Sequence, residues 1–440
     1  MQHRAGRARR ALVPRPDDGR PRPAQHQGAH AVRRRAAHLP GRLPGARRPQ
    51  VAAHRGARPA ARSRDRARGR ADPRLRDDRV ADRAAARVGS RAVSGNQAVR
   101  IRRAPDGLPA PDDFELVTEA VPEPGDGEVL FRARYMSVDP AMRRYLPAPA
   151  GAPHPLGGTA AVGDVVVAGP PPPTSGYTGG CVGEVLVSRH PAWRAGDLVQ
   201  GGSRWQTHHV VPGDSLVAVP EGGELLHELG VLGQPGFVAW WGVRRVAAVK
   251  PGETFVVSAA GGAIGMVAGQ LARAAGARVV GVASGEKARY VTEVLGFDAC
   301  VDRHDEPVAD ALDRLCPDGI DVYFDNVGAD TARACFDRLR DFGRYVVCGM
   351  AGEYNAREAE TGPPLRPVLR KRLRIEGYVI YDHYDEFPAF RSEVSALLAA
   401  GDLRYRYDVR PGLASAPDAL ARLLQGRNEG KVVVDLEADA

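Results

Sequence analysis

The chain has 440 residues and a formal net charge of +9 at pH 7. Residues 1–95 hold 26 Arg and no Lys against seven Asp and no Glu, a net charge of +19, so residues 96–440 carry −10. This division excludes a uniformly basic protein and assigns the whole excess of positive charge to an N-terminal leader.

Residues 1–95 also lack Phe, Trp, Tyr, Ile and Cys. Such a segment cannot bury enough apolar surface to offset its chain entropy, so we expect a disordered Arg-rich leader. Three origins stay open: a basic tail for nucleic acid, an organelle transit peptide, or a mis-assigned start. The absence of Lys, Ile, Phe, Tyr and Asn before Asn96 favours translation of GC-rich DNA upstream of the true start.

The sequence lacks the patterns of a membrane span, of a signal peptide and of a disulfide or zinc-binding framework. There is no run of 18 apolar residues and no apolar signal-peptide core. The five cysteines are odd in number, widely spaced and form no C-x-x-C pair, which argues against disulfides and structural zinc. We therefore expect a soluble, cytoplasmic protein without a bound metal.

Residues 96–221 read as a β-rich domain, because short apolar runs alternate with Gly and Pro. Residues 170–173 form a polyproline stretch that is typical of a loop. The predicted strands are 128–134, 162–168, 183–187, 197–200, 208–211 and 216–219.

Residues 222–393 change to alternating helix and strand patterns, which indicate crossover units and a parallel sheet. Predicted helices are 225–233, 236–248, 263–275, 286–295, 308–315, 332–339 and 390–400. Predicted strands are 254–258, 278–283, 299–301, 322–326 and 345–348. A last helix at 416–424 and a last strand at 431–436 belong to a C-terminal segment, 394–440.

The strongest motif is the turn AAGGAIG, between the strand at 254–258 and the helix that follows. As a variant of G-x-G-x-x-G it places Ala260, Gly262 and Gly265 at the motif positions, with Ala263 and Ile264 between them. Gly262 would let the backbone approach a pyrophosphate, and Gly265 would let helix and strand pack closely. The alternative is an ordinary tight turn, but the surrounding β-α-β pattern favours a dinucleotide site.

The second strand of this unit distinguishes NADP from NAD. An NAD site has an acidic residue about twenty positions after the motif, whereas the strand at 278–283 ends in Ala-Ser-Gly. Lys287 and Ser284 could instead bind a 2′-phosphate. A solvated surface lysine is the alternative, and Glu286 weakens the phosphate interpretation, but we favour NADP(H).

Several segments then resemble the prostaglandin reductase and alkenal/one oxidoreductase family, the zinc-free medium-chain reductases also called leukotriene hydroxydehydrogenases. The resemblance runs from about residue 96 to the C-terminus. It rests on RYMSVDPAMRR, GGCVGEVLVSRHPAWRAGD, EKARYVTEVLGFD, PDGIDVYFDNVG, CGMAGEYN, KRLRIEGYVIYD and GRNEGKVVV. It implies an α/β protein with a GroES-like β-barrel domain at 96–221, a doubly wound Rossmann domain at 222–393, and a C-terminal return at 394–440.

The resemblance also implies roles for residues outside the glycine turn. Tyr354 resembles the active-site tyrosine, whose phenol could hydrogen-bond a substrate carbonyl or help deliver a proton. The other implied cofactor contacts are Asn326, Cys348, Gly349, Tyr378, Val379, Ile380 and Asn428. From the residues alone, Tyr354 could equally be a loop tyrosine, the two asparagines turn residues, and 378–380 a buried strand.

Four departures from the family pattern bear on the site. Ala141 replaces an aromatic residue of the DPYMRGRM motif, and Arg303 stands where the family has a tyrosine near the cofactor phosphate. Val238-Ala239-Trp240 replaces a T-A-Y motif, and the Pro- and Gly-rich stretch 148–177 is long. His208 and His209 are adjacent in a predicted strand, so their side chains point to opposite faces and cannot share a metal.

The predicted function is NADPH-dependent reduction of the C=C bond of α,β-unsaturated ketones and aldehydes, in a homodimer as the resemblance implies. A quinone reductase of the same superfamily is the nearest alternative, and a zinc alcohol dehydrogenase is disfavoured because its G-H-E motif is absent. Two other classes stay open: a nucleic-acid-associated protein acting through the leader, and a cofactor-sensing pseudoenzyme. We expect no nucleic acid and no membrane as partners.

Overall fold

The computed structural model describes residues 95–148, 160–166, 180–202, 204–356 and 361–438. All of them belong to one compact unit, Arg79–Ala440. The predicted disordered leader and most of the Pro- and Gly-rich stretch 148–177 lie outside the described residues. Within the described ranges, no helix is long and apolar enough to cross a membrane.

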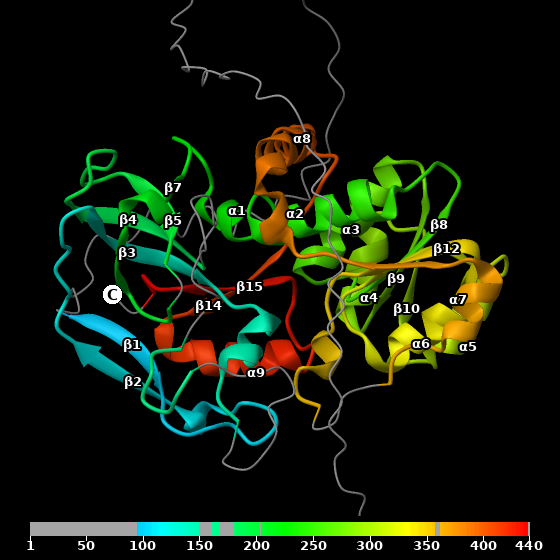
Figure 1. Ribbon diagram of the computed structural model, residues 1–440, viewed down its shortest axis with the longest axis horizontal. Coiled ribbons are helices and arrows are strands. Elements are labelled where there is room, and N and C mark those ends of the chain that lie inside the picture. Colours follow the sequence, from blue (N-terminus) through cyan, green and yellow to red (C-terminus); the bar gives the residue numbers. More distant parts are fainter. Residues whose placement is uncertain (1–94, 149–159, 167–179, 203, 357–360, 439–440) are drawn as a thin grey trace, which may run out of the picture. The chain divides into compact units, whose positions relative to one another are not determined.

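Six parallel strands form one sheet, which is of the type found in nucleotide-binding domains (Figure 1). Its strand order, β10-β9-β8-β11-β12-β13, is that of a Rossmann sheet, with the order reversing between β8 and β11. The strands are β8 (Thr254–Ser258), β9 (Arg278–Ala283), β10 (Ala299–Asp302), β11 (Ile320–Asp325), β12 (Leu339–Val347) and β13 (Arg374–Gly377).

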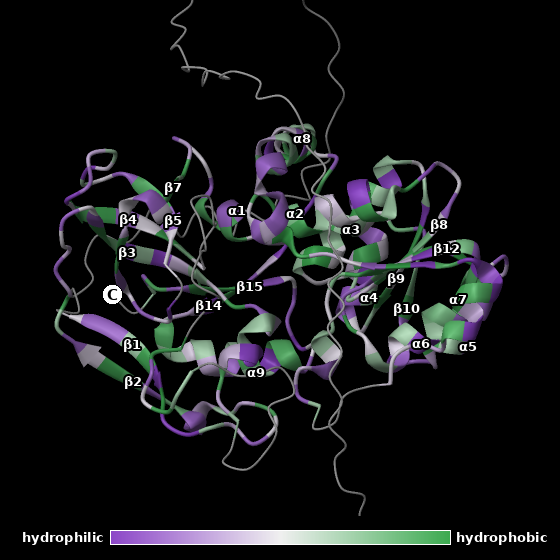
Figure 2. Ribbon diagram, in the orientation of Figure 1, coloured by the Kyte–Doolittle hydropathy of each residue, from purple (hydrophilic) through white to green (hydrophobic). Residues whose placement is uncertain are grey.

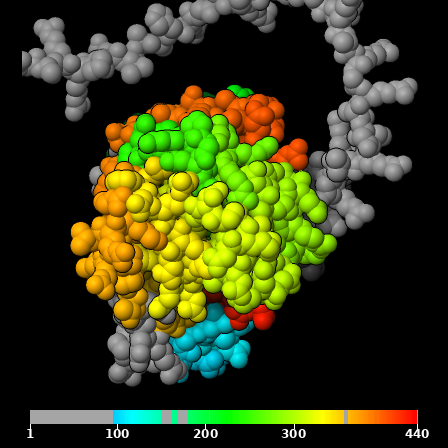
Figure 3. Space-filling view, turned by 90° about the vertical axis from the view of Figure 1, so that its right-hand side faces the viewer, coloured from blue at the N-terminus to red at the C-terminus, as the bar shows by residue number. Residues whose placement is uncertain are grey.

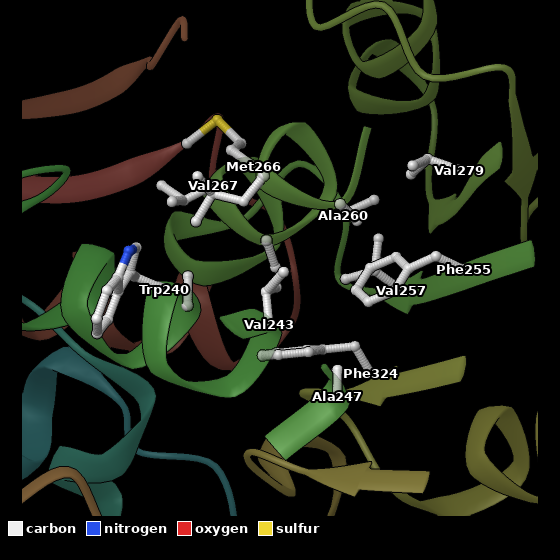
Figure 4. Close-up of a cluster of buried hydrophobic side chains, with 14 of the residues drawn as sticks. Trp240, Val243, Ala247, Phe255, Val257, Ala260, Met266, Val267, Val279 and Phe324 are labelled. Atoms are coloured by element: carbon white, nitrogen blue, oxygen red, sulfur yellow. The ribbon is translucent and has the colours of Figure 1, made fainter. Parts of the chain in front are cut away.

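The central strands of this sheet are apolar on both faces because helices cover both. Phe255 and Val257 of β8 point into one core cluster and Val256 into the other, as the two-residue period of a strand requires. Figure 4 shows the first cluster, where Phe324 and Val243 pack beside Phe255 and Val257. The apolar colouring of the central strands in Figure 2 follows from this double burial.

Helices from different parts of the chain cover the two faces. Residues of α2, α3 and α8 pack into the first cluster, and residues of α5 and α6 into the second. Figure 3 shows the outer face of this region, where the yellow surface lies between the yellow-green surface of the preceding residues and the orange surface that includes α7. The helices are α1 (Leu225–Leu229), α2 (Gln234–Trp241), α3 (Ala263–Ala274), α4 (Glu286–Glu293), α5 (Val308–Leu315), α6 (Ala329–Asp337), α7 (Leu365–Lys371), α8 (Phe387–Ala400) and α9 (Ala416–Leu424).

A separate seven-stranded sheet has the order β14-β15-β3-β4-β5-β7, with β6 paired to β3, and β1 and β2 form a two-stranded antiparallel sheet. The C-terminal strand β15 pairs antiparallel with β3, so the end of the chain returns to this sheet. The strands are β1 (Asn96–Ile101), β2 (Phe114–Glu119), β3 (Glu128–Ser137), β4 (Cys181–Ser188), β5 (Leu198–Gly201), β6 (His208–Pro212), β7 (Val217–Ala218), β14 (Tyr407–Pro411) and β15 (Lys431–Asp435).

Short irregular helical turns connect these elements near the site. They are η2 (Pro140–Tyr145), η4 (Gly242–Ala247), η5 (Ala351–Glu353) and η6 (Ile380–Glu386). The predicted helix 236–248 differs from the structure in its second half, because α2 continues into the π-helical turn η4 and ends where Ala248 adopts a left-handed conformation with φ 46°. A π-helical turn is a common feature near functional sites.

The predicted fold class is confirmed: a doubly wound parallel Rossmann sheet is joined to a separate, largely antiparallel β domain. One predicted strand is wrong within the described residues. At 162–168 the chain turns at Gly163, with φ +95°, and only Val165 forms an isolated bridge, to Arg100. The predicted opposite orientation of the two histidines is confirmed, because His209 is buried and stacks on Phe131 while His208 contacts Thr207.

Candidate active site

A cavity of about 490 Å³ is lined by residues of both sheets and of the turns between them. Its size is typical of small-molecule sites. Every site residue predicted from the sequence lines it except Ala260, which is buried beneath the glycine turn. These lining residues are Gly262, Ala263, Ile264, Gly265, Ser284, Lys287, Arg303, Asn326, Cys348, Gly349, Tyr354, Tyr378, Val379, Ile380 and Asn428.

The N-terminus of α3 faces this cavity. Gly262 is the N-cap, and the N–H groups of the first turn, Ala263 to Gly265, have no partner within the helix. A Cβ at Gly265 would lie 2.3 Å from the Ala259 carbonyl oxygen, so only glycine lets the helix pack against the turn. The free N–H groups and the helix dipole make this end an anion site.

Lys287 lies beside this helix end. The aliphatic part of its side chain packs against the glycine turn, where a Cβ at Gly261 would be 3.0 Å from Lys287 Cβ. Its Nζ donates to the Gly426 carbonyl oxygen at 2.5 Å. Burial, followed by the nearby charges of Arg303 and Arg406, lowers the pKa of Lys287 to about 8. The lysine is therefore not a freely solvated surface residue.

Arg303 and Asn428 complete the same end of the cavity. A Cβ at Gly426 would lie 3.1 Å from Nη2 of Arg303, so the guanidinium lies against the Gly426 turn. Asn428 is buried, and its Nδ2 donates to the Gly430 carbonyl oxygen at 2.7 Å. This gathering of cations with few acids suits a phosphate group. We call it the cationic end, defined by Lys287, Arg303 and Asn428.

Asn326 follows β11 at the carboxyl edge of the sheet. Its Nδ2 donates to the Ser258 carbonyl oxygen at 2.8 Å, and its backbone N–H donates to Ser258 Oγ at 2.8 Å. Its Oδ1 is buried and accepts no hydrogen bond from the described residues. A buried acceptor without a donor costs free energy, so a hydrogen bond from a bound ligand to this oxygen would stabilise the site.

A buried carboxylate holds this turn in place. Asp325 accepts hydrogen bonds from Ser258 Oγ at 2.9 Å, from the phenols of Tyr323 at 2.7 Å and Tyr345 at 2.8 Å, and from two backbone N–H groups of the next turn. Its side chain is fully buried. The position of Asn326 is thus fixed by hydrogen bonds from three strands.

Tyr354 also lines the cavity, directly after η5. Its hydroxyl lies 3.9 Å from the place where a Cβ at Gly349 would stand, so the phenol and Gly349 are neighbours. Burial raises the pKa of Tyr354, while a hydrogen bond with the Met350 backbone and the charge of Arg144 oppose that rise. The phenol is therefore a neutral donor at physiological pH.

Tyr378 and Cys348 form a pair on the cavity wall. The Tyr378 hydroxyl donates to the Val238 carbonyl oxygen at 2.7 Å and lies 3.3 Å from Cys348 Sγ. Burial raises the pKa of Cys348 to about 12, so the thiol stays protonated and unreactive.

Sequence reasoning did not single out a buried ion pair in the cavity. Lys431 is 1 % exposed, and its Nζ donates to Ser137 Oγ at 2.6 Å and to Asp139 Oδ1 at 2.5 Å. This pair ties the C-terminal strand β15 to the turn that begins η2. A charged residue at the start of an apolar strand was the only signal in the sequence.

The sequence analysis also did not predict three cavity residues around Tyr354. Arg144, Tyr145 and Tyr381 line the cavity, and the charges of Tyr381, Arg144 and Tyr354 all act on the Tyr145 phenol. We call this the tyrosine end, defined by Arg144, Tyr145, Tyr354 and Tyr381. Arg144 and Tyr381 lie in the segments RYMSVDPAMRR and KRLRIEGYVIYD, but nothing in those segments indicates that the folded chain brings them together with Tyr145.

The residues present fit a dinucleotide with an additional phosphate. The helix N-terminus offers free N–H groups, the cationic end offers positive charge, and the unpartnered Oδ1 of Asn326 offers an acceptor. The tip of β9 carries Ala283, Ser284 and Gly285, so the strand itself ends without the acidic residue of an NAD site. The Rossmann sheet and this cavity thus define a dinucleotide-dependent oxidoreductase.

Comparison with known proteins places the chain within that class. Two family models match it: the N-terminal domain of oxidoreductase at residues 97–219, and the zinc-binding dehydrogenase domain at residues 263–396. Among the described residues, no group of three or more His, Cys, Asp or Glu could hold a metal ion.

Two curated relatives and one solved structure are similar over nearly their whole length. NADPH-dependent curcumin reductase of Escherichia coli is 39% identical, covering 78% of this chain and 99% of its own. The NADP⁺-dependent 2-alkenal reductase of Nicotiana tabacum is 35% identical, covering 77% and 97%. The structure of CurA from Vibrio vulnificus in complex with NADPH matches with a TM-score of 0.68 and 33% identity, covering 77% and 98%.

The chain belongs to the medium-chain dehydrogenase/reductase family, and the predicted resemblance to its alkenal/one oxidoreductase branch is confirmed.

Proposed function

We propose that the protein reduces the C=C bond of α,β-unsaturated ketones and aldehydes with NADPH. The observation that carries the proposal is one cavity lined by two chemically different groups of residues: the cations Lys287 and Arg303 with Asn428 at the cationic end, and phenols at the tyrosine end. The relatives' names support an NADP cofactor and, in one case, an alkenal substrate.

The cofactor of this chain is NADP. We propose that the first turn of α3 holds its pyrophosphate, and that Lys287, Ser284 and Arg303 hold its 2′-phosphate. We further propose that Asn326 and the segment 378–380 contact its nicotinamide half, with Cys348 and Gly349 beside them, and that Asn428 lies near its phosphates. When bound, NADPH supplies the hydride that the substrate's β-carbon receives.

The chain's own contribution is to place and polarise the substrate carbonyl. Negative charge develops on the carbonyl oxygen as the β-carbon is reduced, and a hydrogen bond from the Tyr354 phenol stabilises that charge. The raised pKa keeps the proton on Tyr354 before reaction. The same phenol is placed to help deliver the proton that the α-carbon receives.

NADPH and NADH consumption with simple enones tests this proposal. We expect NADPH to be preferred, and Tyr354→Phe to lower kcat about 10- to 1000-fold, the usual effect of removing one such donor. Tyr407→Phe, outside the cavity lining, is the matched control and should keep full activity. Full activity in Tyr354→Phe would contradict the role of the tyrosine.

The other functions left open by the sequence give different results in the same assay. A quinone reductase would consume NADPH with benzoquinone but not with an enone. A cofactor-sensing pseudoenzyme would bind NADPH and consume none with any enone. No feature of the cavity favours either, so they serve as outcomes of the experiment.

We also propose a homodimer and a cytoplasmic location. The edge strand β13 is exposed along its four residues and pairs on one side only, with β12. An unpaired edge of this kind is suited to strand pairing with a second copy. All five cysteines are free, as expected in a reducing compartment. Light scattering on the purified protein tests the dimer, and cell fractionation tests the location.

A further inference from the structure

The charged residues that line the cavity are not balanced. The carboxylates of Asp139 and Glu228 are each paired with a cation, Lys431 and Arg391 respectively, and one partner of each pair is buried. Three cations of the lining then remain without a carboxylate partner among the described residues: Arg144, Lys287 and Arg303. The cavity therefore has an excess of positive charge that attracts anions.

These three cations lie at two separate places. Lys287 experiences the charges of Arg303 and Arg406, so these belong to the cationic end. Arg144 acts instead on the phenols of Tyr145 and Tyr354. The cofactor phosphates account for Lys287 and Arg303, but they leave Arg144 unexplained.

Arg144 and its neighbour Arg143 have different environments. Arg143 is buried, and its guanidinium donates to Asn355 Oδ1 at 3.1 Å and to the Gly107 carbonyl oxygen at 3.2 Å. Arg144 is exposed, lines the cavity and forms no hydrogen bond or ion pair with the described residues. The Tyr145 hydroxyl, next in the chain, likewise has no hydrogen bond to them.

We propose that Arg144 and Tyr145 form a subsite for a carboxylate on the substrate. This inference rests on the proposed function and narrows its substrate class to α,β-unsaturated carbonyl compounds with a carboxylate remote from the C=C bond. A guanidinium presents two parallel N–H donors that match a carboxylate, and the adjacent phenol adds a neutral donor. Because Arg144 is exposed, its use as a binding group carries little desolvation cost.

The test compares a matched pair of enones, benzalacetone and its para-carboxylate. The native protein should use the carboxylate with the higher kcat/KM, and added salt should reduce that preference. Arg144→Met should lower kcat/KM about 10- to 100-fold more for the carboxylate than for benzalacetone, chiefly through KM. Tyr145→Phe should have a smaller effect in the same direction. Arg102→Met, an exposed arginine outside the cavity lining, is the control.

A binding measurement separates this subsite from the proposed reaction. Calorimetric titration of the carboxylate enone into the NADP⁺-loaded protein should show about tenfold weaker binding in Arg144→Met, whether or not turnover occurs. NADPH affinity, measured by fluorescence, should not change, since a change would assign Arg144 to the cofactor. Equal losses for both enones, or equal binding of the carboxylate by variant and native protein, would overturn the subsite. NADPH binding without consumption of either enone would overturn the proposed reaction alone.

Discussion

Lys287 is the residue whose predicted role depends most directly on its protonation. Its pKa of about 8 means that it is cationic below pH 8 and neutral above it in the free protein. NADPH affinity should therefore fall as pH rises from 7 to 9.5, by up to about tenfold per pH unit once the proton is lost. NADH, without the 2′-phosphate, should show no comparable decline. Fluorescence titration of both cofactors across this pH range measures the difference.

Substitution of the same residue gives an independent check. Lys287→Met should weaken NADPH binding about 10- to 100-fold and remove most of its pH dependence, because the neutral side chain cannot titrate. Lys250→Met, a substitution of an exposed lysine, should leave both cofactor affinities unchanged. If NADH affinity fell as much as NADPH affinity, Lys287 would be a structural residue of the turn and no phosphate partner.

Arg143 positions the loop that carries Tyr354. It is 5 % exposed, and its hydrogen bond to Asn355 joins η2 to the residue directly after the tyrosine. Arg143→Met and Asn355→Ala should each lower kcat about 3- to 10-fold with a smaller effect on KM, because the donor loses its fixed position.

A double-mutant cycle distinguishes this coupling from a general loss of structure. If the two residues act through one contact, the double variant should be about as impaired as either single variant. Multiplying effects would contradict the positioning role. The melting temperature of each variant shows how much of the loss is due to unfolding.

The sequence predicted those site residues that belong to short local patterns. The glycine turn, Lys287 and Tyr354 each lie in a segment whose neighbours identify it. Lys431 and Asp139 also lie in such segments, but their ion pair could not be predicted, because the two residues are 292 positions apart in the chain. Ion pairing across such distances leaves no periodicity in the sequence.

At the scale of elements, β8, β11 and β12 are joined below the site by Asp325. The carboxylate is fully buried, and the described residues provide it with hydrogen bonds from Ser258, Tyr323 and Tyr345. Asp325→Ala should lower the free energy of unfolding by about 2–4 kcal/mol, because several buried donors lose their acceptor. Urea denaturation measures this loss. Asp402→Ala, at an exposed position, should change it by less than about 0.5 kcal/mol.

The same contact network predicts an effect on the cavity. Without Asp325, the turn that holds Asn326 loses its support, so the variant should bind NADPH more weakly even under conditions where it is folded. A stable Asp325→Ala variant with unchanged NADPH affinity would show that Ser258 alone positions Asn326.

The strands and helices that the sequence predicted correctly are those with strong apolar periodicity. β8, β9, α5 and α9 have the predicted bounds, since each is buried on at least one face. The strands β1, β2, β13 and β14 were not predicted. β13 is exposed at all four residues, and β2 alternates irregularly, so neither shows a buried face in its sequence. Their strand form is imposed by pairing with a neighbour.

At the scale of the whole molecule, the C-terminal segment returns to the sheet of β3. β14 and β15 join the sheet of β3 although they follow the Rossmann strands in the chain. We propose the division 96–221, 222–393 and 394–440 on this basis, with the first and last parts forming one folded domain. The pairing of β15 with β3 and the ion pair of Lys431 with Asp139 then link the chain's end directly to the cavity.

The uneven distribution of charge along the chain predicts how the protein changes when residues 1–94 are removed. The full chain carries +9, whereas residues 95–440 alone carry −10, so the shortened protein should bind an anion exchanger at pH 7. Salt-sensitive binding to duplex DNA by the full chain alone would instead favour the alternative of a nucleic-acid tail, because all 26 arginines of that tail lie in the removed part. Reduction of enones should stay within about twofold, since the described residues that line the cavity include every proposed catalytic and cofactor-binding group except the buried Ala260, and all of these lie in the part that is kept. Gel shift assays at several salt concentrations and enone assays on both proteins measure these effects. Loss of reductase activity on shortening, with NADPH binding retained, would instead assign the N-terminal residues a part in the reaction.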